Sequence, residues 1–291
     1  MWNRVFLLVS GIASGWTLVG LLTVPRDQLK TQAWRLSVSL AVGIFVIVLL
    51  FVSSPQAALT ASITLLFCIF IAYAAKARQV NKEGELTLPR MNDRPLIIST
   101  DIGVLLVSED EPTEYKGLVP WALRFRRREA RGQAVPHWLM RPLAFARIRT
   151  AYRAMGSRNP LHGWLIHLVE SLAARLGEGF VVRGASLSSE PTVAALLVRL
   201  AEKGLTRVCL VSLGLSQDAL EPMYEQVSLS GARECGVQVL YIPGLEGEKW
   251  PLGSPEERLQ ALSQGKAVAV SQDAVPAVLD DLQDRITAAL A

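Results

Sequence analysis

The sequence predicts three transmembrane helices followed by an α/β domain built on a doubly wound parallel sheet. Three long, uncharged apolar runs occupy roughly the first quarter of the 291 residues. Short β-rich runs then alternate with amphipathic helical patterns, an order typical of a parallel sheet with helices on both faces. About 200 residues follow the apolar runs, which is enough for one domain with a sizeable core.

The apolar runs are Val5 to Val24, Leu36 to Val52 and Ala57 to Ala75. Each is about long enough to cross the hydrocarbon core, and an uncharged run in a bilayer satisfies its backbone polar groups only as a helix. A cleaved signal peptide is the alternative for the first run, but its length and the two later runs favour a membrane span. We therefore expect an anchor over residues 1–78, a linker over 79–94 and the α/β domain over 95–291.

The distribution of positive charge predicts the orientation of the anchor. Basic residues lie between the first two runs and after the third, whereas the turn at residues 53–56 is uncharged. Cytoplasmic loops carry an excess of Lys and Arg, so we expect the α/β domain in the cytoplasm and the N-terminus outside the cell (inner) membrane. Arg4 is the one charge against this orientation. The basic residues are Arg26, Lys30, Arg35, Lys76, Arg78 and Lys82.

The remaining chain alternates predicted strands and helices. The predicted strands are Ile102 to Val107, Phe180 to Arg183, Arg207 to Leu213, Val237 to Ile242 and Ala267 to Val270. The predicted helices are Pro160 to Leu176, Pro191 to Lys203, Gln217 to Cys235, Pro255 to Leu262 and Val275 to Leu290. Ligands of such sheets usually bind at the carboxyl ends of the strands.

Several of these segments, taken in order, resemble a known family. They are Ile102 to Val107, Tyr152, Gly156-Ser157 with Pro160-Leu161, Glu190 to Val193, Lys203-Gly204 and Val208 to Val211. Together they resemble the N-terminal half of ferrochelatase, which inserts ferrous iron into protoporphyrin. The resemblance implies a chelatase-like, Rossmann-like fold and makes heme or protoporphyrin the possible ligand.

The departures from the family bear on catalysis. Where the resemblance implies the family's metal-side histidine, this chain has Asp273. An aspartate can bind iron as a hard oxygen donor, but it does not titrate near neutral pH as imidazole does. The family's second essential group, a glutamate, belongs to the half that has no counterpart here. We therefore expect that iron insertion has been lost. An active chelatase would have to use Asp273, the candidate metal ligand, or the acidic loop from Glu109 to Glu111 as its metal-side group.

The loops that follow the predicted strands supply the other candidate ligand contacts. Ser212, Gly214 and Ser216 lie between a strand and a helix, where backbone N–H groups could hold an anion, and Tyr152 is a further candidate. The Walker lysine and the three-glycine dinucleotide fingerprint are missing from this loop. The acidic run from Ser108 to Glu111 is either a solvated turn or a place where a cation could sit.

A basic and aromatic segment is the other distinctive feature of the domain. The candidate docking residues are Arg124, Arg126, Arg127, Arg128 and Trp138. Anionic lipid and a protein partner are the expected contacts, and a tetrapyrrole propionate or plain solvent are the alternatives. Nucleic acid is not expected, because no recognition fold accompanies the charge.

These observations predict a membrane-anchored, ferrochelatase-like protein without catalytic activity. It would serve as a binding or scaffold subunit of a membrane assembly, or in handling heme or a related tetrapyrrole. The alternative is an active ferrochelatase-type chelatase in which two chains supply the two halves of the cleft. Expected partners are the lipid bilayer, other membrane proteins or a second copy, and a tetrapyrrole.

Overall fold

In a computed structural model the chain forms two compact units. The first comprises residues 1–86 and 115–150, and the second comprises residues 87–114 and 151–291. The structure describes residues 2–82, 102–109, 111–130, 132–187, 191–215, 217–245, 253, 255–270 and 275–291.

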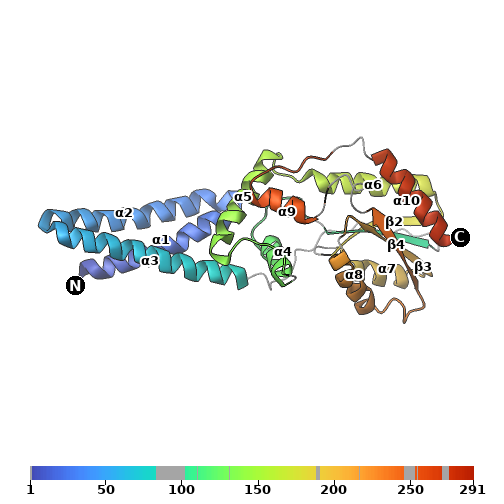
Figure 1. Ribbon diagram of the computed structural model, residues 1–291, viewed down its shortest axis with the longest axis horizontal. Helices are drawn as coiled ribbons and strands as arrows, with labels where there is room; N and C mark the ends of the chain where they lie inside the picture. Colours follow the sequence, from blue (N-terminus) through green and yellow to red (C-terminus); the bar gives the residue numbers. More distant parts are fainter. Residues whose placement is uncertain are drawn as a thin grey trace. The chain divides into compact units, whose positions relative to one another are not determined.

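Three long apolar helices form the core of the first unit: α1 (Trp2–Thr23), α2 (Leu29–Ser53) and α3 (Pro55–Lys82). They run side by side (Figure 1), and the short helix η1 (Arg26–Gln28) joins the first two. All three are long and apolar enough to cross a membrane. The prediction of three such helices is confirmed.

Small residues on α1 allow close approach to α3. A Cβ atom added at Gly11 would lie 2.6 Å from the Cβ of Cys68, and one added at Gly15 would lie 2.2 Å from the carbonyl oxygen of Ile69. The residue on α3 that is contacted has a higher number at Gly15 than at Gly11, so α1 and α3 run in the same direction. The glycines in the first apolar run therefore serve packing within the chain, at distances that a larger side chain would not allow.

Helix α2 runs in the opposite direction and is joined to α1 by serine hydroxyls. Ser14 donates from its Oγ to the Oγ of Ser39 over 3.0 Å, and Ser10 donates to the carbonyl oxygen of Ser39. Further along, Gly20 on α1 faces Gln32 on α2. The end of α1, the start of α2 and the end of α3 therefore lie at the same end of the bundle.

The first unit also contains residues 115–150, which we call the 115–150 segment. It holds α4 (Val119–Ala130), η3 (Trp138–Met140) and most of α5 (Arg141–Ala154). The rings of Phe125 and Phe145 lie 5.7 Å apart and join α4 to α5. Both phenylalanines are buried, so the segment has an apolar core of its own.

A four-stranded parallel sheet forms the centre of the second unit. Its order is β2-β1-β3-β4, so β1 and β3 are the inner strands. The inner strands are rich in Val and Leu and almost completely buried, as expected when helices cover both faces. The strands are β1 (Ile102–Ser108), β2 (Phe180–Ser186), β3 (Arg207–Leu213) and β4 (Gln238–Leu245).

Helices cover both faces of this sheet (Figure 1). On one face α6 (Pro160–Leu176) and α10 (Val275–Leu290) enclose a core that includes Trp164 and Leu282. On the other face α7 (Val193–Glu202) and α8 (Gln217–Leu229) enclose a second core. Helix α9 (Pro255–Ser263) precedes α10. The prediction of an α/β domain with a parallel sheet is confirmed.

Two predicted elements differ from the structure. Ala267 to Val270 is not a strand: Val268 donates its backbone N–H to the Sδ of Met155 over 3.4 Å instead of to a neighbouring strand. A short apolar run forms a strand only where the edge of a sheet is available to pair with it, and here the tertiary contact with Met155 prevails. The predicted helix from Gln217 to Cys235 ends at Leu229, because the Ser230 hydroxyl bonds the carbonyl oxygen of Val227 and Gly231 has a φ of 62°.

Candidate functional site

Three serines end neighbouring strands at the carboxyl edge of the sheet. Ser108 lies opposite Ser186 in the β1–β2 register, and Ser212 lies near the end of β3. All three are buried. After Ser212 the chain turns at Gly214, whose φ of 59° favours glycine. The candidate Ser216 lies outside the described residues, and the role of Ser212 and Gly214 as ligand contacts remains a prediction.

The acidic run after β1 contains a buried ion pair. The Glu111 side chain is fully buried, and its Oε1 accepts a hydrogen bond of 2.9 Å from Nε of Arg258. Its Oε2 accepts a second bond of 2.7 Å from Nδ2 of Asn159. Arg258 also donates from Nη1 to the carbonyl oxygen of Gly253. Glu111 is therefore not part of a solvated turn, and both carboxylate oxygens are engaged. Asp110 lies outside the described residues.

Tyr152 and Asn159 hold the chain that follows this glutamate. The Tyr152 hydroxyl donates to the carbonyl oxygen of Pro112, and Asn159 donates its backbone N–H to that of Thr113. Asn159 also caps α6, because its Oδ1 accepts the N–H of Leu161 over 3.0 Å. Tyr152 is buried and its hydroxyl is bonded to the backbone, so the described geometry gives it a structural role.

A metal centre is not formed by the described residues. Within the described ranges, no three His, Cys, Asp or Glu side chains gather closely enough to hold a metal ion. The candidate metal ligand Asp273 lies outside those ranges. Burial raises the pKa of the Cys209 thiol to about 11, so this side chain is a protonated core residue at neutral pH.

In the first unit the 115–150 segment binds the end of α1. Arg149 donates from Nη1 to the carbonyl oxygens of Leu21, over 2.9 Å, and of Val24, over 2.8 Å. The Tyr115 hydroxyl donates to the carbonyl oxygen of Thr23 over 3.0 Å. The last carbonyls of a helix have no partner within the helix, and a cation there also interacts favourably with the helix dipole. Burial raises the pKa of Tyr115, which Arg149 opposes, and burial lowers the pKa of Arg149.

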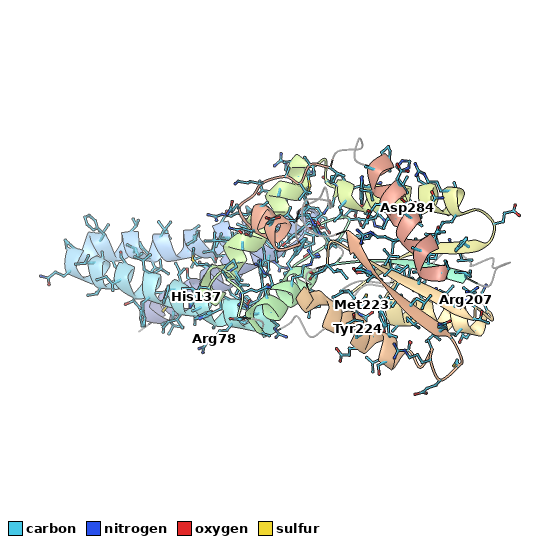
Figure 2. All side chains as sticks on the ribbon, turned by 45° about the vertical axis from the view of Figure 1, so that its right-hand side comes forward. Arg78, His137, Arg207, Met223, Tyr224 and Asp284 are labelled. Carbon is cyan, nitrogen blue, oxygen red and sulfur yellow. The ribbon has the colours of Figure 1, made fainter. Side chains whose placement is uncertain are left out.

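The same segment binds the end of α3 through η3. Tyr73 donates from its hydroxyl to the carbonyl oxygen of Leu139 over 3.0 Å, and Asn81 donates from Nδ2 to that of Trp138 over 3.3 Å. The guanidinium of Arg78 lies 5.2 Å from the centre of the Trp138 ring, a cation–π geometry. Figure 2 labels Arg78 and His137, whose imidazole lies 5.4 Å from that ring. The docking candidate Trp138 is thus stacked within the first unit.

Arg141 connects three parts of the first unit from a buried position. It forms an ion pair of 2.6 Å with Glu129, donates to Oδ1 of Asn81 over 3.2 Å and donates to the carbonyl oxygen of Pro136 over 3.1 Å. Its partners therefore come from α4, from α3 and from the chain that precedes η3.

The other docking candidates lie on α4. Arg124 is buried, with its guanidinium 5.6 Å from the centre of the Trp121 ring. Arg126 is half-buried, and Arg128 donates from Nε to the Gln133 side chain over 3.0 Å. The side chain of Arg127 lies outside the described part of the structure. The guanidinium groups of Arg124 and Arg128 therefore contact side chains of the first unit itself.

A different stripe of the segment faces outward. Met140 and Leu143 are 50% and 37% exposed, and Arg147 one turn further along α5 is exposed as well. Residues three or four apart lie on the same face of a helix, so these side chains form one surface. Met140, the first residue of this surface, follows Leu139, whose carbonyl oxygen accepts a hydrogen bond from Tyr73 of α3. The backbone at the start of the surface is therefore attached to the apolar helix α3.

Sequence reasoning did not predict these structural contacts. Asn81 is a short amide side chain in the last turn of the third apolar helix, which is the kind of signal that could have indicated a capping or docking role. The pairing of Glu111 with Arg258 had no local signal, because 147 positions separate the two residues.

Comparison with known proteins adds no family assignment. No protein-family model matches the sequence, and no curated protein matches it either. The resemblance to ferrochelatase therefore remains a hypothesis.

Proposed function

We propose that the protein is a multi-pass membrane protein in which a ferrochelatase-like α/β domain serves as a non-catalytic binding or scaffold subunit. The observation that carries this proposal is the attachment of the 115–150 segment to the ends of α1 and α3. Its Arg149 donates to backbone carbonyls at the end of α1, and its own backbone at Leu139 accepts a hydrogen bond from Tyr73 of α3. Arg141 is buried in an ion pair with Glu129. In this proposal the basic segment is first of all a structural support for the anchor.

The charge pattern supports a cytoplasmic position for this segment. The basic residues that end α3 and those between α1 and α2 lie at one end of the bundle, because α1 and α3 run in parallel. Positive charge favours the cytoplasmic side of a membrane. Residues 115–150 bind the same end of the bundle and would lie at the inner leaflet.

The outward stripe of η3 and α5, formed by Met140, Leu143 and Arg147, supports contact with lipid. Tyr73, which binds the backbone at Leu139, lies within the apolar part of α3. Met140 and Leu143 would therefore reach the boundary between headgroups and acyl chains, with the Arg147 guanidinium among anionic headgroups. This arrangement of an apolar and a basic surface is the one expected of an interfacial helix.

A fluorescent probe tests this contact with lipid. The Met140→Cys variant is made in a Cys235→Ser background, labelled with a polarity-sensitive dye and placed in lipid nanodiscs. We expect the emission of the dye to be shifted to the blue. The matched control is Leu229→Cys, an exposed position on α8 of the second unit, whose emission should be that of a dye in water. Equal emission from both positions would contradict the contact.

The arrangement around Glu111 supports a non-catalytic domain. A chelatase that used the acidic run as its metal-side group would need a carboxylate free to bind iron. Both oxygens of Glu111 are instead bonded to Arg258 and Asn159. The visible absorption spectrum tests this directly: the full chain in nanodiscs is titrated with protoporphyrin and then given ferrous iron. We expect no conversion to the heme spectrum, and conversion would make the protein a chelatase.

A further inference from the structure

The outer edge of β4 carries backbone groups that face away from the sheet. Gln238 donates its N–H to the carbonyl oxygen of Thr206, so it bonds toward β3. In a parallel ladder this direction alternates, which places the N–H and C=O of Val239 and Tyr241 on the outer edge. Pro243 is the next outward position, and its carbonyl oxygen accepts a 2.8 Å hydrogen bond from Arg285. The edge is thus closed at Pro243 and open over Val239 to Tyr241 within the described structure.

Two tyrosines lie beside this open stretch, on the face that α8 covers. The rings of Tyr224 and Tyr241 meet edge to face, with their centres 4.7 Å apart. Tyr224, labelled in Figure 2, is 46% exposed. They line a cavity of about 420 Å³ together with Arg233, whose Nη2 donates to the Tyr241 hydroxyl over 3.3 Å. Aromatic side chains next to unpaired backbone groups are typical of a protein interface rather than of a solvated edge.

We propose that a second copy of the chain pairs with this edge, β4 against β4, about a two-fold axis at Leu240. An antiparallel pair centred there places Val239 of one copy opposite Tyr241 of the other. In that register each residue gives its N–H to, and accepts from, the residue opposite, so the outward groups satisfy one another. The same axis brings both tyrosine pairs to one face. Pro243 sets the limit of the pairing, since it has no N–H to donate.

This proposal does not depend on the ferrochelatase resemblance and is tested by the mass of the full chain in detergent. The wild type should have about twice the 31.8 kDa of one chain. Val239→Pro removes an outward donor and leaves the bonds to β3 in place, so it should give the single-chain mass with an unchanged circular dichroism spectrum. Val239→Thr keeps the N–H and the strand preference, and should remain dimeric. A monomeric wild type, or a dimeric Val239→Pro variant, would overturn the proposal.

Disulfide cross-linking tests the register and does not depend on tolerance of proline. In a Cys235→Ser background, Leu240→Cys should form a covalent dimer on mild oxidation, because the two copies of residue 240 face each other at the axis. Gln238→Cys should not, because its two copies would lie about 13 Å apart along the strands. Cross-linking at 238 without cross-linking at 240 would exclude this register. The absence of both would exclude the β4 pairing, and would leave the edge to another partner.

Discussion

At the scale of single residues, the carboxylate of Glu111 carries the largest expected effect on stability. It is fully buried, and its charge is balanced by Arg258. Glu111→Ala leaves that guanidinium buried without its counter-charge, so we expect the free energy of unfolding to fall by about 3–5 kcal/mol. Thermal unfolding of the purified protein, followed by circular dichroism, measures this loss.

An exposed ion pair in the same region provides the control. Glu114 and Arg158 lie 3.4 Å apart, with 41% and 81% of their side chains exposed. Water already stabilises both charges, so Glu114→Ala should lower the free energy of unfolding by no more than roughly 1 kcal/mol. Equal losses in the two variants would show that Glu111 is not the buried, paired group described here.

Cys209 predicts a pH dependence at the same scale. Burial raises the pKa of its thiol to about 11, from a reference value of 9.0. Between pH 9 and 11 the unfolded chain therefore releases this proton while the folded chain retains it, and the stability of the fold decreases as pH rises. The loss should reach up to roughly 3 kcal/mol at pH 11.

The Cys209→Ala variant isolates this contribution. It should be less stable than the wild type at pH 8 because it leaves a small cavity, but its stability should fall less steeply between pH 9 and 11. Tyrosines titrate equally in both proteins and cancel in the comparison. Parallel pH profiles for the two proteins would contradict the raised pKa.

At the scale of elements, the end of α1 depends on Arg149. Its guanidinium binds two backbone carbonyls there, whereas the side chain of Arg147, two positions earlier, is exposed. Arg149→Met should lower the free energy of unfolding of the first unit by roughly 2–3 kcal/mol, because two carbonyls lose a charged donor. Arg147→Met should change it by less than about 0.5 kcal/mol. Thermal unfolding in detergent compares the two, and an equal effect of both would rule out the role of Arg149.

Contact between α1 and α3 depends on Gly15. A methyl group there would meet the carbonyl oxygen of Ile69 and lie 2.8 Å from the Cβ of Ala72. Gly15→Ala should therefore force the helices apart and cost roughly 1–3 kcal/mol. Gly163→Ala, in the first turn of α6 with no heavy atom within 4 Å of the added carbon, should instead be neutral or stabilise by up to about 1 kcal/mol. A neutral Gly15→Ala variant in the same thermal assay would disprove the close contact.

Local patterns predicted most elements of this fold. Helix α6 has an Asn159 cap and a proline at its start, and the apolar runs of β1 and β3 are long and continuous. Such signals lie within the element itself. Ala267 to Val270 has a strand pattern but bonds to Met155, because the outcome there depends on a neighbour that the pattern does not contain.

At the scale of the whole molecule, the contacts that define the candidate sites could not be predicted from the sequence. Arg149 binds a carbonyl 125 positions earlier, and Glu111 pairs with an arginine 147 positions later. The sequence showed an excess of positive charge near Arg124 and Trp138, but not which cations would be buried. The outcome depends on the partners that tertiary packing brings to each cation, such as Glu129 and Asn81 for the buried Arg141.

The central proposal is that the three apolar helices span the membrane and hold the α/β domain on the cytoplasmic side. Cys235 in the second unit is exposed, whereas Cys68 and Cys209 are buried, so a membrane-impermeant maleimide reports on one native site. In intact spheroplasts we expect Cys235 to stay unlabelled until the membrane is permeabilised. Gln56 is exposed at the start of α3, at the opposite end of the bundle. The Gln56→Cys variant in a Cys235→Ser background should therefore be labelled without permeabilisation. Labelling of Cys235 in intact spheroplasts would place the domain outside the cell and contradict the account.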